Sequence, residues 1–244
     1  MDTPNITLVI PMYNESGIIK DTALILDKYM REHFERYEII FSDDGSTDGS
    51  ADALRELALD SVRVIGYEDN RGKGSAVRHA MLEARGDIIM FTDADLAYGT
   101  DVVKRAYEKM LAEPDIDMLI GSRNLSEDGY DGYTAMRKLM SKAYIRTLGF
   151  MGGFRLSDSQ CGCKAFRGKA AKDIFGRAKI NGFAFDFECI LWAQKLGYKI
   201  GEMPVKIINH RESKVRVFKD TLKMLRDVYG IRRRVNKEFK RESK

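Results

Sequence analysis

Short apolar segments of strand length alternate with longer helical patterns through the first half of the chain. Strands are expected over residues 6–11, 38–42, 62–66, 87–92 and 117–121. Helices are expected between them, over residues 16–34, 47–59, 73–84 and 100–111. Strands that are separated by helices pair in parallel through crossover connections. The order therefore predicts an α/β fold, with a mostly parallel sheet and helices on both faces.

Two of the expected helices begin at residues that suit an N-cap. Ser16 is expected to cap the first helix, and Ser46 or Thr47 the second. Side-chain oxygens at these positions accept backbone N–H groups that have no partner inside the helix. Both assignments place the start of the helix close behind a strand.

The second half of the chain is less regular. Residues 126–133 are polar and rich in glycine, which is typical of a loop. Helices are expected over about 134–148 and 183–196, and a strand over about 199–208. From 214 to 231 apolar residues recur at helical spacing with cations on the other side, which predicts a basic amphipathic helix.

The composition fits one large globular domain. The 244 residues are 44% hydrophobic and 32% charged, enough to bury a core and too ionic for a lipid-facing surface. The longest apolar stretches fall short of the roughly 18 residues of a membrane-spanning helix, and no secretion signal is expected at the start. Three cysteines are too few for a disulfide framework, so reduced thiols in a cytoplasmic protein are expected.

Positive charge is concentrated toward the carboxyl terminus. The net charge of the whole chain is +4, but residues 211–244 hold thirteen Lys and Arg against five Asp and Glu, a net charge of +8. Such a basic segment suits an anionic partner, either a nucleic acid or a membrane surface. A solvated terminus without a partner is the alternative.

Asp93 and Asp95 follow the fourth expected strand two positions apart. Alternate side chains of an extended chain share one face, so these carboxylates lie roughly 7 Å apart on the same side. Carboxylates this close repel unless a cation lies between them, and a hard divalent ion accepts such oxygen ligands. The pattern predicts a metal site, with an acidic turn of no further function as the alternative.

Polar clusters also follow two other strands. The first strand ends in Pro11-Met12-Tyr13-Asn14-Glu15, and the second is followed by residues 43–50, which begin with Asp43 and Asp44. The third expected helix opens at residues 70–74, where free backbone N–H groups and Lys73 suit an anion. Ligands of parallel sheets bind at the carboxyl ends of the strands, so these clusters predict a single site.

Three common nucleotide and metal motifs fail at a required position. A phosphate-binding P-loop would need glycine where the chain has Tyr67, and a dinucleotide-binding loop would need glycine at Val77. A calcium-binding EF-hand that started at Asp44 would need glutamate where Arg55 stands. These three classes of site are excluded.

Taken together, the motifs resemble those of the family 2 glycosyltransferases, which have the GT-A fold. The segments "VIPMYNE", "SDDGSTDGS", "NRGKGSAVRHAM", "FTDADLA" and "GSR" carry this resemblance in the first half. The later segments "DSQCGCKAFRGKAA", "GFAFDFECILWAQKLG" and "HRESKV" are similar to dolichyl-phosphate glucosyltransferases, with dolichyl-phosphate mannose synthases as near relatives. The resemblance implies one Rossmann-like domain over residues 1–210, with a nucleotide-sugar half (1–122) and an acceptor half (123–210). A basic helix and tail would follow over 211–244.

The resemblance also implies roles for individual residues. A nucleotide-sugar pocket would be made by Pro11, Tyr13, Glu15, Asp43, Asp44, Lys73, Arg78 and Asp93. Metal ligation is implied for Asp93 and Asp95, acceptor or phosphate binding for Gln160, Arg211 and Lys214, and catalytic positions for Arg123, Asp186 and Glu188. Asp186 would act as a base only toward a hydroxyl acceptor, because a phosphate acceptor is already a nucleophilic anion at neutral pH.

The implied function is an inverting transfer of a hexose, with UDP-glucose as the favoured donor and a polyprenyl or dolichyl phosphate as acceptor. Mg²⁺ or Mn²⁺ would be the cofactor, and residues 214–244 would attach the enzyme to the anionic cytoplasmic face of a membrane. No nucleic-acid partner is implied. A GDP-mannose-dependent transferase is the near alternative, disfavoured by Ala97 where mannose synthases usually carry glutamine. A haloacid-dehalogenase-type phosphatase with Asp93 as nucleophile, and a non-catalytic nucleotide-sugar-binding protein, are alternatives from other classes.

Overall fold

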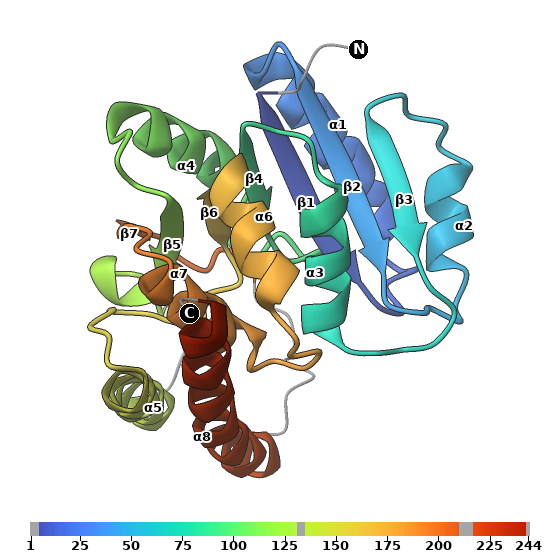
Figure 1. Ribbon diagram of the computed structural model, residues 1–244. Coiled ribbons are helices and arrows are strands. Elements are labelled where there is room, and N and C mark those ends of the chain that lie inside the picture. Colours follow the sequence, from blue (N-terminus) through green and yellow to red (C-terminus); the bar gives the residue numbers. More distant parts are fainter. Residues whose placement is uncertain (1–4, 131–134, 210–216, 243–244) are drawn as a thin grey trace.

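A seven-stranded sheet organises the chain, in the order β3-β2-β1-β4-β6-β5-β7 (Figure 1). The structure is a computed structural model, and it describes residues 5–130, 135–209 and 217–242 of the chain. At 135, 137–139 and 217–226 it describes the backbone alone. Neighbouring strands are parallel except β6, which runs antiparallel to β4 and β5. The strands are β1 (Ile6–Met12), β2 (Tyr37–Asp43), β3 (Val62–Gly66), β4 (Ile88–Phe91), β5 (Met118–Ser122), β6 (Lys164–Arg167) and β7 (Ile200–Pro204).

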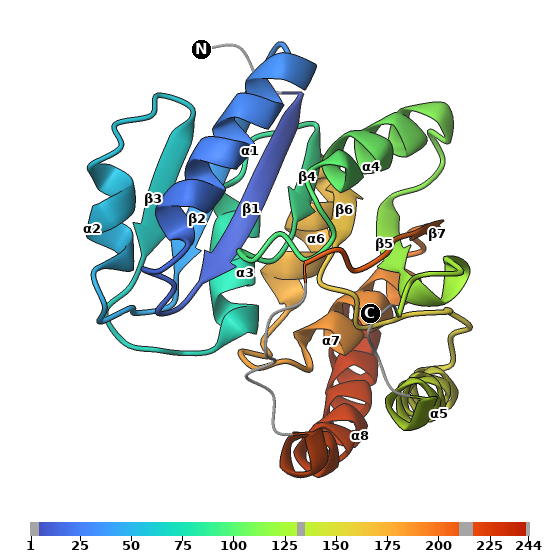
Figure 2. The same cartoon turned by 180° about the vertical axis from the view of Figure 1, so that it is seen from behind.

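Helices cover both faces of this sheet. α1 and α4 lie on one face (Figure 2), and α3, α6 and α7 lie on the other (Figure 1). The helices are α1 (Ile19–His33), α2 (Ser50–Arg55), α3 (Lys73–Glu83), α4 (Asp101–Ala112), α5 (Ala135–Gly152), α6 (Gly168–Arg177), α7 (Phe185–Lys195) and α8 (Val217–Glu242), with a 3-10 turn at Arg123–Leu125. The predicted α/β architecture is therefore confirmed.

The side chains of each central strand alternate between two cores. In β1, Leu8 and Ile10 pack in the core under α1 and α4, whereas Val9 packs in the core under α3, α6 and α7. All three side chains are fully buried. Each such burial stabilises the fold by roughly 1.5–3 kcal/mol, which fixes the strand register, because a shift of one residue would exchange the two faces.

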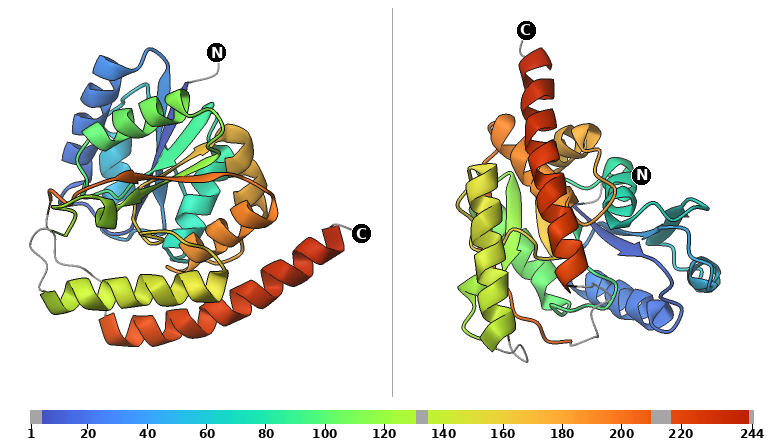
Figure 3. Two further views of the ribbon diagram at one scale, coloured as in Figure 1. Left: turned by 90° about the vertical axis from the view of Figure 1, so that its left-hand side faces the viewer. Right: turned by 90° about the horizontal axis from the view of Figure 1, so that it is seen from below.

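α5 and α8 lie side by side outside the α7 layer (Figure 3). Val228, Ile231 and Val235 of α8 are buried in the second core. The apolar side of this part of α8 therefore packs on the protein. Among the described residues, no helix combines the length and the apolar composition that crossing a membrane requires.

The structure corrects both predicted helix caps. α1 begins only at Ile19, with Ile18 at its N-cap, and the backbone N–H of Ser16 donates to Asp48 instead. α2 is shorter than residues 47–59 because Gly49, with φ of 81°, holds the N-cap position. The hydroxyl of Ser46 donates to Asp43, so it does not cap α2.

The second half contains two elements that the sequence patterns did not predict, β6 and α6. β6 has four residues and begins with a buried lysine, Lys164, so it lacks the apolar run that marks a central strand. The predicted helices correspond to α5 and α7, and the predicted strand is β7, shorter than expected at its carboxyl end. The expected free thiols are confirmed, since Cys161, Cys163 and Cys189 are buried and unpaired.

Candidate active site

The carboxyl ends of β1, β2 and β4 meet at one edge of the sheet. β1 is paired in parallel with β2 on one side and β4 on the other, with Met12 opposite Asp43 and Val9 opposite Phe91. The segments that follow these strands therefore come together (Figure 1). This edge carries the polar clusters that the sequence analysis singled out.

Hydrogen bonds tie the segment after β1 to the segment after β2. The backbone N–H of Asn14 donates to Ser46 Oγ at 2.9 Å, and Glu15 N–H donates to Ser50 Oγ at 2.9 Å. Asn14 adopts a left-handed conformation (φ 52°) and accepts a bond from the Thr47 N–H. The two segments thus form one braced surface, with Tyr13 42% exposed at its rim.

Asp44 is buried and organises the loop that leads into α3. Its carboxylate accepts hydrogen bonds from Tyr67 Oη at 2.6 Å and Asn70 Nδ2 at 3.0 Å. The backbone N–H groups of Arg71 and Gly72 also donate to it. Its contacts therefore position the loop, and the ribose or base contact expected of Asp44 stays a prediction.

Asp43 keeps one oxygen available at the same edge. Its Oδ1 accepts bonds from the Ser46 N–H at 3.0 Å and the Ser46 hydroxyl at 2.5 Å. Within the described part of the chain, Oδ2 has no hydrogen-bond partner. Gly45, with φ of 76°, passes so close to the next loop that a Cβ would lie 2.6 Å from the Glu68 carbonyl oxygen. Only glycine fits at this position, and its close approach to the next loop keeps the segment that carries Asp43 and Asp44 in place.

Asp93 is the centre of the candidate site. Lys73 Nζ forms an ion pair with its Oδ1, and both side chains are about a quarter exposed. Burial lowers the pKa of Lys73, but Asp93, with Asp186 and Asp95, outweighs burial and the net shift is upward. A Cβ on Gly162 would overlap Asp93 Oδ2, so the carboxylate lies directly against the backbone of the loop before β6.

Asp95 lies two residues further along the same turn, partly buried. Its Oδ1 accepts the Ala97 N–H at 3.1 Å, which fixes the turn after β4. Asp93 and Asp95 provide the hard oxygen donors that Mg²⁺ and Mn²⁺ prefer. The described residues include no cluster of three side chains that could hold a metal alone. The two carboxylates therefore fit a divalent cation that takes its other ligands from substrate or water.

Lys164 is a buried cation that the sequence analysis missed. Its ammonium lies 2.7 Å from Asp186 Oδ1 and 2.7 Å from the Cys161 carbonyl oxygen. The side chain is fully buried, on the β6 residue that is opposite Phe91 in β4. The available signal was a lysine inside the apolar run Cys163-Lys164-Ala165-Phe166, because a buried lysine needs a partner.

Asp186 lies in the first turn of α7, beside this lysine. Burial raises the pKa of Asp186, and the Lys164 ammonium opposes that shift. Lys73 and Asp93 also act on its charge, with opposite signs. Asp186, Lys164, Asp93 and Lys73 thus form one cluster of alternating charge.

The structure gives Glu188 and Arg78 other partners. Glu188 is fully buried and accepts the N–H groups of Lys179 and Ile180, together with Arg234 Nη2 at 2.5 Å. Arg78 donates to the 178–181 loop, to the Ala178 carbonyl and the Asn181 side chain. These contacts bind α3, α7 and α8 to one loop, so the expected roles of Glu188 at the sugar and Arg78 at the diphosphate gain no support from the geometry.

Arg123 is held by a carboxylate that the sequence analysis did not select. Asp158 is fully buried and accepts Arg123 Nε at 2.6 Å and Nη2 at 3.1 Å. Burial lowers the pKa of Arg123, but Asp158, with Tyr98 and Cys161, outweighs burial, so the net shift is upward and the guanidinium stays charged. Gln160 lies nearby, with its N–H donating to Asp158 Oδ1. Arg211 and Lys214 lie outside the described residues.

The architecture is that of the GT-A fold, which two solved structures share. The solved mannosyl-3-phosphoglycerate synthase from Rubrobacter xylanophilus has a TM-score of 0.73 and 18% identity, over 96% of this chain and 75% of that one. Glucosyl-3-phosphoglycerate synthase from Mycobacterium tuberculosis, solved with Mn²⁺, UDP and phosphoglyceric acid, has a TM-score of 0.69 and 18% identity. That match covers 93% of this chain and 79% of that one.

Sequence comparison identifies the family. The pattern of Glycosyl transferase family 2 matches residues 7–175. The dolichyl-phosphate beta-glucosyltransferase of Saccharomyces cerevisiae is 30% identical over 247 residues, which cover 93% of this chain and 74% of that relative. The chain therefore belongs to the family 2 glycosyltransferases, as its motifs predicted. The phosphatase alternative is set aside.

Proposed function

We propose that this chain transfers glucose from UDP-glucose to a polyprenyl phosphate, such as dolichyl phosphate, with inversion at the sugar carbon. The observation that carries the proposal is the charged cluster at the carboxyl edge of the sheet, where Asp93, Lys73 and Asp186 converge. The yeast relative, named a dolichyl-phosphate beta-glucosyltransferase, supports the sugar and the acceptor. The UDP that accompanies the same fold in the Mycobacterium structure supports the donor.

The donor binds in the nucleotide-sugar half, residues 1–122. The uridine lies between Tyr13 and the loop after β2, where Asp43 Oδ2 accepts a hydrogen bond from the base or ribose. Pro11 and Glu15 shape the same surface. When the donor binds, Lys73 leaves Asp93 and pairs with the diphosphate. Its ammonium then neutralises part of the negative charge that develops on the diphosphate as the bond to the sugar breaks.

Asp93 and Asp95 would hold a divalent metal, Mg²⁺ or Mn²⁺, beside the diphosphate. When bound, the ion supplies Lewis-acid stabilisation of the leaving diphosphate. Because Gly162 lies against Asp93, the loop before β6 keeps that carboxylate at the donor side of the cluster.

The acceptor phosphate binds in the acceptor half, residues 123–210, at Arg123 and Gln160. Asp158 fixes the Arg123 guanidinium before any ligand arrives. A phosphate monoester has a second pKa near 6 and is largely dianionic at neutral pH, so it attacks without a general base. Asp186 is therefore not needed as a base and orients the sugar instead, while Lys164 holds the Asp186 carboxylate. Arg211 and Lys214, which lie outside the described residues, are the further cations that the family resemblance implies for the acceptor phosphate.

The enzyme acts at the cytoplasmic face of a membrane as a peripheral protein. The basic residues of 211–244 support an attraction to anionic lipid, at about 1 kcal/mol for each cation near the surface. A GDP-mannose donor remains the second candidate, because the family resemblance includes the mannose synthases.

A thermal-shift comparison of UDP and GDP, each with and without Mn²⁺, tests the donor. A ligand at about 100 times its dissociation constant stabilises the folded state by roughly 2.7 kcal/mol. We expect the corresponding rise in melting temperature with UDP and Mn²⁺ only. Incubation with labelled UDP-glucose and dolichyl phosphate should then give a labelled lipid. A shift with GDP alone would move the proposal to mannose, and the absence of both shifts would overturn it.

A further inference from the structure

α5 presents an uncharged stripe to solvent along its whole length. Exposed residues recur there at the heptad-like spacing of one helix side, and they are Met136, Met140, Ala143, Thr147 and Phe150. Phe150 is 88% exposed, the most of any large hydrophobic side chain that the structure describes. The hydroxyl of Thr147 donates to the Ala143 carbonyl, so its polar group is satisfied within the helix. A contiguous apolar stripe on an exposed helix marks an interaction site, so we infer that another molecule covers this surface.

α8 extends this surface on the neighbouring side. Tyr229 is 68% exposed, and Arg232 and Arg233 are exposed next to it. A cavity of about 300 Å³ between the two helices is lined by Phe150, Tyr229 and both arginines. The opposite side of α8 is fixed to the body through the buried side chain of Ile231 and through the Arg234–Glu188 ion pair. Figure 3 shows the two helices forming one outer layer of the molecule.

Cations surround the stripe. A larger cavity, about 770 Å³, lies between α5 and the 153–157 loop, and Lys142, Arg146 and Arg155 line it. Neither cavity has an acidic residue among the described residues that line it. A second copy of the chain would place these cations against one another, whereas an anionic surface would neutralise them. Charge complementarity therefore favours an anionic lipid bilayer over a dimer.

The larger cavity also connects this surface with the acceptor half. Asn124 and Ser157 line it together with Phe150, and Asn124 Nδ2 donates to the Ser157 carbonyl at 2.6 Å. Asn124 follows Arg123, and Ser157 precedes Asp158, which binds Arg123. A phosphate at the bilayer surface would thus meet the cations of this cavity on its way to Arg123.

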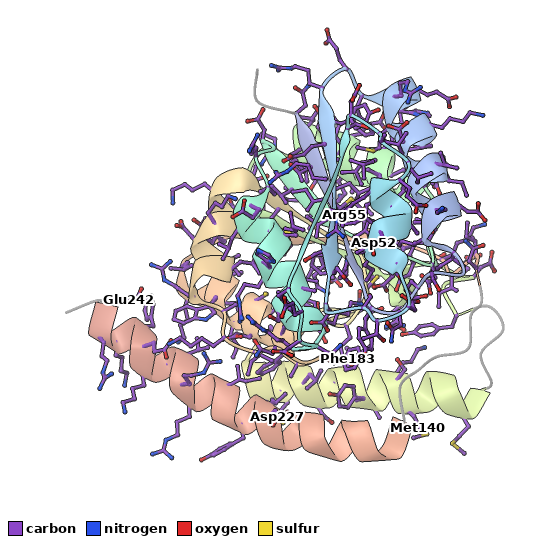
Figure 4. The ribbon with its side chains drawn as sticks, turned by 90° about the vertical axis from the view of Figure 1, so that its right-hand side faces the viewer. Asp52, Arg55, Met140, Phe183, Asp227 and Glu242 are labelled. Carbon is purple, nitrogen blue, oxygen red and sulfur yellow. The ribbon has the colours of Figure 1, made fainter. Side chains whose placement is uncertain are left out.

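We propose that the face formed by α5 and the adjoining side of α8 is a docking surface for an anionic phospholipid bilayer. Phe150 and the methionines enter the acyl boundary, and the flanking lysine and arginines bind lipid phosphates. Figure 4 shows α5, on which Met140 is labelled, and α8 beside it along one side of the molecule. The proposal rests on the proposed function only in linking the docked face to the acceptor, and it differs from attachment by the terminal tail alone.

Vesicle flotation of the full chain tests this surface. The vesicles contain phosphatidylcholine alone or with 30% phosphatidylglycerol, and the stripe variant is Met136→Gln/Met140→Gln/Phe150→Ser. We expect at least tenfold weaker binding of the stripe variant to the anionic vesicles, and weak binding of every protein to phosphatidylcholine. The matched control is Leu24→Gln/Leu111→Ser, which changes exposed side chains of α1 and α4 and should leave vesicle binding within twofold.

A second variant separates charge from apolar insertion. Arg146→Gln/Arg233→Gln should weaken binding to anionic vesicles about tenfold, whereas Lys20→Gln/Lys104→Gln should not. Unchanged vesicle binding of the stripe variant would overturn the proposal. So would a dimer of the unaltered chain, seen by analytical ultracentrifugation and lost in the stripe variant, because a second copy would then cover the face.

The same proteins distinguish this proposal from the proposed function. The UDP thermal shift should be equal in the unaltered chain and the stripe variant, which also shows that the variant is folded. Stripe-dependent vesicle binding without transfer to dolichyl phosphate would leave the docking surface standing and overturn the function. Transfer to a short, water-soluble prenyl phosphate without stripe-dependent vesicle binding would do the reverse.

Discussion

Three separate parts of the chain meet at Asp93. Its own position follows from the end of β4, Lys73 arrives from the start of α3, and Gly162 comes from the loop before β6. The glycine leaves no room for a Cβ between the backbone and Asp93 Oδ2. At the scale of single residues, the site therefore depends on a missing methyl group as much as on its charges.

Gly162→Ala should displace Asp93 and abolish the Mn²⁺-dependent UDP shift, with at least a hundredfold loss of transfer. The added Cβ cannot be placed without moving the Asp93 carboxylate. Gly176→Ala is the matched control, since nothing lies within 4 Å of its Cβ position in α6. That change should stabilise the protein by about 0.5–1 kcal/mol. Full activity of the Gly162→Ala variant would show that Asp93 has room to move.

Lys164→Met should reduce the free energy of unfolding by about 3–5 kcal/mol, because Asp186 would stay buried without its cation. Urea unfolding followed by circular dichroism measures this loss. The double variant Lys164→Met/Asp186→Leu should recover most of the stability, since both charges are then absent. A loss below about 1 kcal/mol in the single variant would mean that Asp186 has another partner.

The loop between β3 and α3 is an element whose shape depends on one carboxylate. Asp44, at the end of β2, accepts bonds from Tyr67, Asn70 and two backbone N–H groups of this loop. The loop delivers Lys73 to Asp93 at the start of α3. An acidic residue that resembles a ligand contact in the sequence thus also builds the element that carries the lysine.

Tyr67 gives this loop a measurable pH dependence. Burial and the Asp44 carboxylate raise the pKa of Tyr67 from 10.0 to about 12. The neutral phenol is therefore favoured in the folded state, so its contribution is complete below about pH 10 and is lost as the pH rises toward 12. Tyr67→Phe should make the decline in stability over this interval shallower, as measured by urea unfolding at several pH values. Tyr229→Phe, at an exposed position, is the control. Identical declines in all three proteins would contradict the assignment.

At the scale of the whole molecule, β6 joins the two halves of the domain. It lies between β4, which ends at the turn that carries Asp93 and Asp95, and β5, which leads to Arg123. Its ladder pairs Ala165 with both Met90 and Leu119. Because one sheet runs through both halves, they should fold and unfold as a unit.

Trp192, the single tryptophan, reports on this coupling from α7 in the acceptor half. UDP with Mn²⁺ should raise the midpoint of the Trp192 fluorescence transition by the same amount as the circular dichroism midpoint. The proposed donor site lies in the other half, so equal shifts of the two midpoints require cooperative unfolding of the sheet. Two separate transitions, with only one shifted, would show that the halves unfold independently.

The sequence by itself determined the parallel part of the sheet and the acidic edge. Buried β-branched strands and the helices between them allow few arrangements, and residues that follow parallel strands must gather at one edge. For this reason Asp43, Asp44, Asp93 and Asp95 were expected at one edge of the sheet, where the structure has the strand ends that they follow, and their roles stay predictions. The helix caps were wrong because Gly49 and backbone contacts of Ser16 decide them, and these depend on how two loops meet.

Only the tertiary structure decided which polar residues pair with one another. Lys164 with Asp186, Asp158 with Arg123, and Glu188 with Arg234 are separated by 22, 35 and 46 residues in the chain. Each pair forms because a buried charge is costly without a partner, and no local pattern records which distant residue supplies that partner. The exposed stripe of α5 likewise became visible only when packing left that side of the helix uncovered.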